Sequence, residues 1–200
     1  MKLYYSPGSC SQNPHIVLRE SGLPFELVLA PTKTKKLPDG SDYLQVNPKG
    51  QVPLLELDNG QRLTEGPAIV QYIADQVPDK GLAPAWGSFE RYRLIEWLNF
   101  TSSELHKSFS PLFSPSVPDD YKAQMRERLQ QRLAYVDSQL AGRAHLLGTP
   151  FTVADSYLFV VSGWSPRVGI EIGGLPNLTA WRERIAARPA VQAALKAEGF

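Results

Sequence analysis

Residues 51–75, QVPLLELDNGQRLTEGPAIVQYIAD, carry the clearest structural signal in this chain. The stretch opens with a Val-Pro pair at a tight turn, and the Asp-Asn-Gly at residues 58–60 is typical of the turn between two hairpin strands. A helix is predicted to begin at Gly66, with Pro67 well placed in its first turn. The segment therefore predicts a constrained turn, two short strands of residues 54–57 and 61–63, and a helix of residues 66–76.

This order of parts can receive a small peptide that carries a free carboxylate. Val52 precedes Pro53, which pushes its backbone toward an extended conformation. If the bond is cis, as a proline at a tight bend sometimes is, the N–H and C=O of Val52 face outward and can pair with an extended ligand as a strand would. Glu65 and Gly66 stand where helix N–H groups attract an anion, and the Glu65 carboxylate can also take an ammonium group. The alternative for each element alone is an ordinary hairpin and helix start.

Composition limits the classes of function. The chain has 200 residues, which suits one large domain or two small ones, and its formal charge is +1 from 21 basic and 20 acidic residues. That balance argues against nucleic acid or an anionic membrane as the main partner. No stretch is long and apolar enough to span a membrane, and we expect no signal peptide at MKLYYSPGSC. A single cysteine excludes an intrachain disulfide and a zinc cluster of cysteines, so a cytoplasmic location is expected.

The first part of the chain reads as a mixed α/β domain. Strands are predicted at residues 2–5 and 25–29, with a helix at 13–20 between them that ends at Ser21-Gly22. A polar, lysine-rich loop follows at 31–41, then a short helix at 42–46. The first strand, helix and strand imply a parallel pair.

The second part reads as helix throughout. Residues 78–84 have the composition of a linker, which predicts one domain at 1–78 and a second, all-helical domain at 86–200. Thr152 and Asp155 form a capping box before an apolar helix that should be buried at the centre. The helices predicted in this domain span residues 89–109, 120–140, 153–164, 178–187 and 190–197.

Cys10 is the first candidate for chemistry. It lies just past the first strand and its Ser-Pro-Gly turn, near the start of the first helix, where the helix end should lower the pKa of its thiol. The alternative is a small buried hydrophobic residue, the usual fate of a free cysteine. No second cysteine follows it, so dithiol exchange within the chain is excluded and a monothiol mechanism with an external thiol remains.

A polar stripe marks the long helix of residues 89–109. Asn99, Ser103 and His106 fall at i, i+4 and i+7, so they share one face, which suggests that this face lines a cleft. The alternative is a solvated helix face. His106 can serve as a proton donor, a proton acceptor or a hydrogen-bonding group. The three histidines do not show metal-ligand spacing.

Other side chains have two open interpretations each. Lys33, Lys35 and Lys36 form a basic loop that is either a solvated run or the source of a partner for a ligand carboxylate. The apolar side chains of Phe109, Phe113 and Trp164 either belong to the core or reach the cleft.

Four stretches together resemble the glutathione S-transferases, and most closely their bacterial beta class. They are YSPGSCSQNPHIVLRE (5–20), NPKGQVPLLELDNGQRLTEGPAIVQYIAD (47–75), IEWLNFTSSELHKSF (95–109) and FTVADSYLF (151–159). The resemblance covers the whole length. It implies a thioredoxin-like N-terminal domain, an all-helical C-terminal domain, a cis bond before Pro53 and a homodimer. It further implies glutathione as co-substrate, with no cofactor.

The resemblance also implies roles for individual residues. Cys10 looks like the cysteine that contacts glutathione and can form a mixed disulfide with it, and Lys35 resembles the residue that meets the glycine carboxylate. Val52 and Pro53 resemble the backbone clamp on the cysteinyl part, and Glu65 and Gly66 the site for the γ-glutamyl end, with only a backbone N–H at Gly66 where many relatives have serine. A further set matches the helical face that completes the glutathione site: Asn99, Ser103, Glu104 and His106, of which Ser103 and Glu104 can reach across a dimer.

Cys10 and His106 are thus the candidate catalytic residues, and Phe109, Phe113 and Trp164 the candidate pocket for the second substrate. One departure from the family concerns that pocket. Pro166 falls where the central helix would continue, so we expect a kink or an early end there, and Gly163 removes a side chain beside it. Both changes predict a wider pocket.

The sequence favours an enzyme that adds the glutathione thiolate to small hydrophobic electrophiles. A related hypothesis is glutathione-dependent disulfide or peroxide reduction through Cys10. The alternatives are a non-catalytic carrier of glutathione or apolar ligands, and a specialised glutathione-dependent isomerase or dehalogenase.

Overall fold

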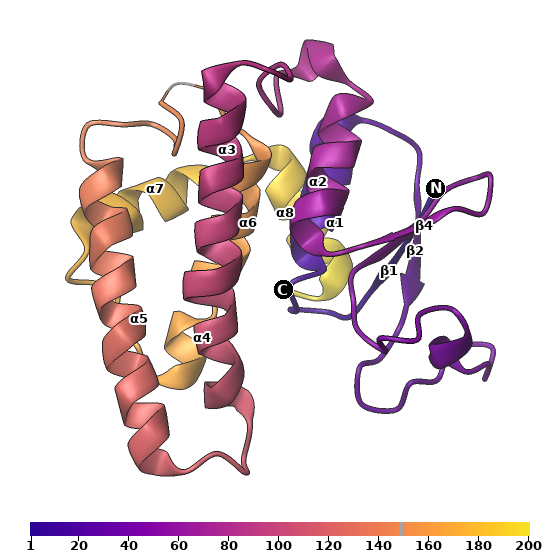
Figure 1. Ribbon diagram of the computed structural model, residues 1–200, viewed down its shortest axis with the longest axis horizontal. Helices are drawn as coiled ribbons and strands as arrows, with labels where there is room; N and C mark the ends of the chain where they lie inside the picture. Colours follow the sequence, from indigo (N-terminus) through magenta and orange to yellow (C-terminus); the bar gives the residue numbers. More distant parts are fainter. Residues whose placement is uncertain (149) are drawn as a thin grey trace. The chain divides into compact units, whose positions relative to one another are not determined.

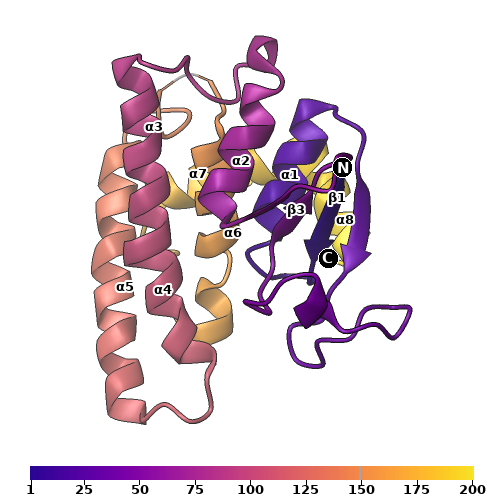
Figure 2. The same cartoon turned by 45° about the vertical axis from the view of Figure 1, so that its right-hand side comes forward.

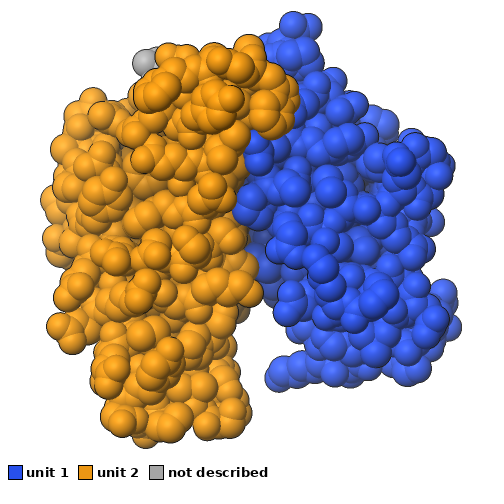
Figure 3. Space-filling view, viewed as in Figure 1, with its two compact units in different colours: residues 1–80, 188–200 blue, residues 81–187 orange. Residues whose placement is uncertain are grey.

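A sheet of four short strands and a group of helices account for most of this chain. The computed structural model describes residues 1–148 and 150–200, and Figure 1 shows their path. The chain forms two compact units: residues 1–80 together with 188–200, and residues 81–187 (Figure 3). The last helix, which the sequence places in the domain of residues 86–200, therefore belongs to the first unit.

The sheet of the first unit has the strand order β2-β1-β3-β4. It consists of β1 (Lys2–Tyr5), β2 (Glu26–Leu29), β3 (Leu54–Glu56) and β4 (Arg62–Thr64). β1 and β2 are parallel, with Leu3 opposite Leu27, as the predicted strand-helix-strand order requires. β1 pairs antiparallel with β3, and β3 with β4, which confirms the hairpin.

Three α-helices complete the first unit: α1 (Gln12–Ser21), α2 (Gly66–Asp75) and α8 (Pro189–Glu198). α1 packs against both α2 and α8 (Figure 2). α1 ends where Gly22 adopts a φ of 74°, in the left-handed region that glycine enters without steric cost. Two short 3₁₀ helices, η1 (Tyr43–Gln45) and η2 (Pro78–Lys80), lie in the connections. This unit is thioredoxin-like, as predicted.

The second unit is helical. Its main helices are α3 (Phe89–Phe100), α5 (Asp119–Leu140), α6 (Val153–Ser162) and α7 (Pro176–Ala186). All ten residues of α6 are buried, which confirms the predicted central helix. The buried positions of α5 form an apolar stripe that consists of Leu129, Leu133, Val136 and Leu140. Within the part of the chain that the structure describes, no helix has the length and apolar character needed to cross a membrane.

The segment predicted as one helix of residues 89–109 changes its hydrogen-bonding class. After α3 it continues as a π-helix, η3 (Thr101–His106), and then as a short α4 (Lys107–Phe109) and a 3₁₀ turn, η4 (Ser110–Phe113). A π segment adds a residue to the turn and so alters which side chains share a face. The spacing of Asn99, Ser103 and His106, which would place them on one face of an α-helix, therefore runs through the wider turn of the π-helix.

The central helix ends early, as Pro166 predicts. α6 stops at Ser162, and a 3₁₀ helix, η5 (Ser165–Val168), carries the proline in its first turn. Arg182 reaches this end of α6 and donates a 2.7 Å hydrogen bond to the carbonyl of Phe159. That carbonyl also accepts from the backbone N–H of Gly163 at 3.1 Å, so the guanidinium adds a second hydrogen bond at the end of the helix. A Cβ at Gly163 would lie 3.2 Å from Arg182 Nη2, so the glycine leaves room for this contact.

Candidate functional site

The thiol of Cys10 meets the backbone of Val52. Cys10 lies in the loop between β1 and α1, two residues before the helix begins, and its side chain is partly exposed. Its Sγ donates to the Val52 carbonyl oxygen at 3.3 Å. The Val52-Pro53 peptide bond is cis, as the family resemblance implies. The structure thus brings together two residues 42 positions apart that the sequence proposed separately.

Two side chains hold the turn that precedes Val52. The Tyr43 hydroxyl and the Asn47 amide both donate to the carbonyl oxygen of Gln51, at 2.8 and 2.7 Å. Burial raises the pKa of the Tyr43 phenol, so it stays protonated and remains a donor. Gly50 has a φ of 62°, and a Cβ there would lie 2.9 Å from a methyl of Leu44. The positive φ and the close approach of Leu44 both favour glycine in this turn.

Lys35 lies beside the same turn. Its backbone has a φ of 56°, which is uncommon for a residue with a side chain, and its ammonium group donates to the carbonyl of Gly50. The contact places a positive charge beside the turn that precedes Val52, and Lys35 is one of the three lysines considered as a partner for a ligand carboxylate. Lys33 and Lys36, the other two lysines of this loop, are exposed.

Glu65 occupies a strained position at the start of α2. Its φ of 68° and ψ of 113° are unfavourable for a residue with a Cβ, and strain of this kind is concentrated at functional sites. Its carboxylate accepts a hydrogen bond from Lys49 Nζ at 2.7 Å, and the same ammonium group donates to Thr64 Oγ1. Both side chains are more than half exposed, so a ligand ammonium can replace Lys49 at Glu65.

Gly66 follows in α2 with an ordinary backbone conformation. A Cβ built on it would meet the amide nitrogen of Asn13 at 3.8 Å, an ordinary contact distance. The side chain of Asn13, from the first turn of α1, therefore lies next to the predicted site for the γ-glutamyl end. No sequence pattern had singled out Asn13.

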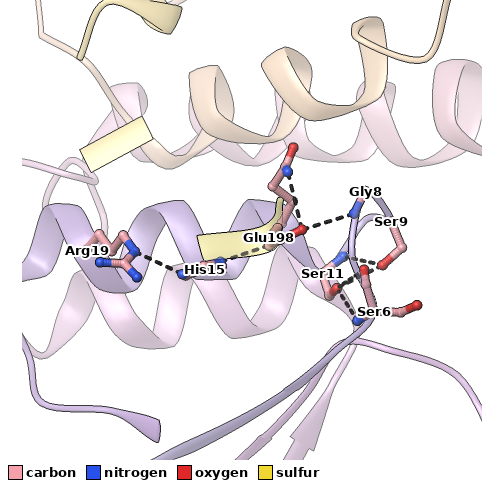
Figure 4. Close-up of polar contacts among 8 residues, drawn as sticks. Ser6, Gly8, Ser9, Ser11, His15, Arg19 and Glu198 are labelled. Carbon is pink, nitrogen blue, oxygen red and sulfur yellow. Dashed lines mark hydrogen bonds and ion pairs between the residues drawn. The ribbon is translucent and has the colours of Figure 1, made fainter. Parts of the chain in front are cut away.

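A buried carboxylate ties the Cys10 loop to the last helix (Figure 4). Glu198 Oε2 accepts from the backbone N–H of Gly8 at 3.0 Å and from the amide of Gln12 at 3.2 Å, and Oε1 lies 2.8 Å from His15 Nδ1. Arg19 Nε donates to the other ring nitrogen of His15 at 2.9 Å. The side chains of His15 and Glu198 are fully buried. One residue near the C-terminus thus fixes the loop that carries the thiol.

Serine hydroxyls shape the same loop from within. Ser11 Oγ accepts from the backbone N–H of Ser6 at 3.0 Å, and it lies 2.8 Å from Ser9 Oγ. It also donates to the Ser6 carbonyl at 3.2 Å. The hydroxyls of Ser9 and Ser11, the two residues that flank Cys10, therefore form hydrogen bonds within the loop.

His106 lies in an aromatic cluster of the second unit. Its Nδ1 is 2.7 Å from the hydroxyl of Tyr157, a residue of α6. The indole of Trp164 lies 5.0 Å from the imidazole, centroid to centroid, and Phe109 and Phe113 pack edge-on against that indole. Phe109 is fully buried and Phe113 is 49 % exposed, so Phe113 is the accessible ring of the three predicted for the second substrate.

Ser103 and Glu104 have partners within the helical unit. Ser103 Oγ donates to the carbonyl of Asn99 at 2.9 Å, and both residues are exposed. Glu104 accepts from Arg132 Nε and Arg128 Nη2, each at 2.9 Å. The hydrogen bond from Arg132, followed by that from Arg128, lowers the pKa of the Glu104 carboxyl below its ordinary value.

Family models match both parts of the chain. Residues 7–76 match the glutathione S-transferase N-terminal domain, and residues 100–189 match the glutathione S-transferase C-terminal domain. The chain belongs to the glutathione S-transferase family. Glutathione S-transferase GstA of Escherichia coli O157:H7 is 50 % identical to it over 200 residues, which is 100 % of both chains.

Solved structures agree with this assignment. A bacterial glutathione S-transferase, BphK, solved as a ternary complex, has 60 % identity and a TM-score of 0.98 over 100 % of both chains. A sphingomonad glutathione S-transferase complexed with glutathione has 54 % identity and a TM-score of 0.97, again over 100 % of both. The beta-class enzyme of Sphingomonas chungbukensis has 52 % identity and a TM-score of 0.96, over 100 % of this chain and 99 % of that one. This chain is a glutathione transferase with the fold predicted for it.

Sequence reasoning missed several supporting residues of this transferase. Asn47, in the stretch NPKGQVP, was detectable, because asparagine before a turn often bonds the backbone two residues on, and here Oδ1 accepts from the Lys49 N–H. Tyr157 and Glu198 carried no such signal, because their partners His106 and Gly8 are 51 and 190 residues away. In the described ranges 1–148 and 150–200, no cluster of three or more His, Cys, Asp or Glu side chains is arranged to hold a metal ion.

Proposed function

We propose that this glutathione transferase joins the sulfur of glutathione to small hydrophobic electrophiles. The observation that carries the proposal is the 3.3 Å contact between Cys10 Sγ and the Val52 carbonyl. It supports a site in which the cysteinyl part of an extended tripeptide pairs with the Val52 backbone and its sulfur lies near Cys10. The Gln51 carbonyl, held by Tyr43 and Asn47, keeps that backbone in place before the ligand arrives.

Charges flank the proposed clamp at the right places for the two ends of glutathione. The Lys35 ammonium beside Gly50 suits the glycine carboxylate. Glu65 suits the ammonium of the γ-glutamyl end, and the N–H of Gly66 at the start of α2 suits its carboxylate. In this binding mode the ligand ammonium replaces Lys49 at Glu65.

The reaction needs the thiolate of glutathione. The bound thiol loses its proton to solvent, and the thiolate sulfur then forms a bond to an electrophilic carbon. With an aryl halide, the halide ion leaves with the bonding electron pair. The protein contributes orientation of the two reactants and hydrogen bonds to the sulfur. Phe113, which packs against Trp164, supplies the apolar surface proposed for the electrophile, and the buried Phe109 supports the same indole.

A second reaction is favoured by the position of Cys10 beside the cysteinyl clamp. The Cys10 thiolate attacks the glutathione sulfur of a mixed disulfide, so that Cys10 carries glutathione and the other thiol leaves. A second glutathione thiolate then attacks that bond, which releases oxidised glutathione and restores Cys10. The mechanism needs Cys10 in its reduced form, which a reducing compartment maintains, and this supports a cytoplasmic location.

Assembly as a homodimer is also part of the proposal, with Ser103 and Glu104 offered to the partner's ligand. The contacts of Asn99, Ser103, Glu104 and His106 with glutathione remain predictions from the family resemblance. Glu104 would have to bind a ligand while it accepts from Arg128 and Arg132.

Replacement of Cys10 by alanine tests how the two reactions are divided. We expect conjugation of glutathione to a chromogenic aryl halide to survive in Cys10→Ala, while reduction of a glutathione mixed disulfide disappears. Equal loss of both activities would contradict that division. Retention of the wild-type protein on immobilised glutathione, with no turnover across several electrophiles, would overturn the enzyme and favour the carrier.

A further inference from the structure

We propose that the hydroxyl of Tyr157 fixes His106 in the tautomer that carries its proton on Nε2. His106 then acts as a hydrogen-bond donor at Nε2 and not as a proton acceptor there. The proposal concerns only residues of the second unit. Its consequence for catalysis rests on the proposed transferase function, whereas the tautomer itself does not.

The side chains of Tyr157 and His106 are in direct contact. The Tyr157 hydroxyl and His106 Nδ1 are 2.7 Å apart, at the short end of hydrogen-bond distances. Tyr157 is 2 % exposed, and its position in a helix buried on all sides gives its ring no freedom to turn away. The two rings meet nearly perpendicular, at 83°, with their centroids 5.9 Å apart. The contact is therefore a built hydrogen bond.

Acidity sets which of the two groups donates the proton in this hydrogen bond. A phenol ordinarily loses its proton with a pKa of about 10, whereas imidazolium does so at about 6.5, so neutral imidazole nitrogen is a strong acceptor and phenol a good donor. The neutral imidazole N–H is a much weaker acid than the phenol. The favourable pairing is therefore O–H of Tyr157 to the lone pair of Nδ1, which leaves the ring proton on Nε2.

Packing around His106 holds its imidazole ring in the position that this hydrogen bond needs. His106 is the last residue of the π segment, and this segment packs against α6. Trp164 lies tilted beside the imidazole at 5.0 Å between centroids, which restricts rotation of the ring and exchange of its two nitrogens. A group that meets Nε2 therefore meets a donor. A thiolate sulfur or a developing negative charge on the electrophile is stabilised by such a donor.

Nitrogen NMR of the imidazole rings tests the tautomer directly. The chain has three histidines, His15, His106 and His145, so ¹⁵N-histidine labelling gives a spectrum that one variant, His106→Asn, assigns. Above the range in which imidazole is protonated, we expect the wild-type His106 signals to be those of the Nε2–H form. Tyr157→Phe, which removes one oxygen atom, should shift the Nδ1 signal toward a mixture of tautomers, whereas the exposed control Tyr121→Phe should leave it unchanged.

Two results would overturn the proposal. One is a wild-type His106 with its proton on Nδ1, a result that does not depend on the Tyr157→Phe variant. The other is a His106 spectrum that is identical in wild type and Tyr157→Phe.

Kinetics test the consequence for catalysis. Tyr157→Phe should lower kcat/KM by roughly tenfold, the effect of losing one well-placed hydrogen bond, with most of the loss in kcat. His106→Gln keeps an N–H near the Nε2 position but cannot take up a proton, so it should retain clearly more activity than His106→Asn. Equal loss in these two variants would contradict a donor role. A wild type that shows the Nε2–H form but no transferase turnover would overturn the proposed function alone.

Discussion

At the scale of single residues, Glu65 is expected to have opposite effects on stability and on ligand binding. Its positive φ costs of the order of 1–3 kcal/mol in a residue with a Cβ, and glycine adopts such a conformation without that cost. The carboxylate, however, is the proposed partner for the γ-glutamyl ammonium. The fold therefore tolerates strain at a residue whose side chain is proposed to bind the ligand.

Glu65→Gly should stabilise the protein and weaken its binding of glutathione. We expect the free energy of unfolding to rise by about 1 kcal/mol, because relief of strain exceeds the added entropy of the unfolded chain. The KM for glutathione should rise at the same time. Denaturant unfolding and steady-state kinetics measure the two effects. Glu65→Gln, which keeps the Cβ and loses the charge, should raise KM with no gain in stability, and a stability gain in that control would show that strain is not the cause.

At the scale of elements, the start of α6 depends on one buried carboxylate. Asp155 accepts from the Thr152 N–H and hydroxyl at 3.0 and 3.1 Å, from the Leu146 N–H at 2.9 Å, and from the Trp181 indole at 3.1 Å. These bonds connect the helix to its preceding loop and to α7. Because α6 carries Tyr157, the same carboxylate supports the position of His106.

Asp155→Ala should therefore destabilise the fold strongly. Removal of the carboxylate leaves several buried donors without an acceptor, and we expect a loss of about 3 kcal/mol or more in the free energy of unfolding. Thr152→Ala, which removes one of the bonds, should cost about 1 kcal/mol. Thermal or denaturant unfolding of the two variants gives the comparison. A similar small loss in both would show that the bonds that Asp155 accepts from Leu146 and Trp181 add nothing to the bonds with Thr152.

The link between η3 and α5 should depend on pH. The folded-state pKa of Glu104 lies below its ordinary value because of Arg132 and Arg128. A lowered carboxyl pKa stabilises the fold above the ordinary glutamate value of about 4.3 and loses this contribution as pH falls through the folded-state pKa. Glu104→Gln should thus be less stable than wild type near neutral pH, by about 0.5–1 kcal/mol, since the groups are partly exposed.

The difference between wild type and Glu104→Gln should shrink as the solution is made acidic. Unfolding by denaturant at a series of pH values measures it. A difference that stays constant, or that grows toward acid pH, would contradict the assignment of the effect to Glu104 ionisation.

At the scale of the molecule, the two ends of the chain meet in the first unit through Glu198. The buried carboxylate holds Gly8 and His15, so the loop that carries Cys10 depends on a residue of α8 (Figure 4). We expect Glu198→Ala to lower the free energy of unfolding by about 3 kcal/mol, because it leaves buried donors unpaired. It should also raise the KM for glutathione.

Asp58→Ala is the matched control for Glu198→Ala. Asp58 also binds a distant part of the chain, the N-terminal ammonium group, but its side chain is 91 % exposed. Its loss should change stability and KM little. Equal effects of the two variants would mean that Glu198 has no special role in placing the Cys10 loop.

Local chemistry explains which elements the sequence predicted. The hairpin of β3 and β4 and the start of α2 follow from the Asp-Asn-Gly turn and from Pro67, and the end of α1 follows from Gly22, because each signal acts within a few residues. The early end of α6 follows in the same way from the inability of Pro166 to continue a helix.

Features that depend on tertiary contacts were not predictable. The π form of residues 101–106 falls where Ser103 and Ser108 bond carbonyls four residues back, a competition whose outcome depends on packing. The proposed site residues Cys10, Val52 and Glu65 were selected from their positions at turns and helix starts. The residues that support this site and His106, namely Tyr43, Glu198 and Tyr157, are ordinary in sequence and gain their roles through tertiary contacts.

Protection of Cys10 by a glutathione analogue tests the central claim most directly. The chain has a single cysteine, so its rate of alkylation can be followed by intact mass without ambiguity. S-methylglutathione cannot react, but it keeps both charged ends and the peptide backbone. We predict that it slows alkylation of Cys10, with half-protection at the concentration that half-inhibits turnover, while S-methylcysteine does not. Unchanged alkylation at a concentration of S-methylglutathione that abolishes turnover would show that glutathione does not bind beside Cys10.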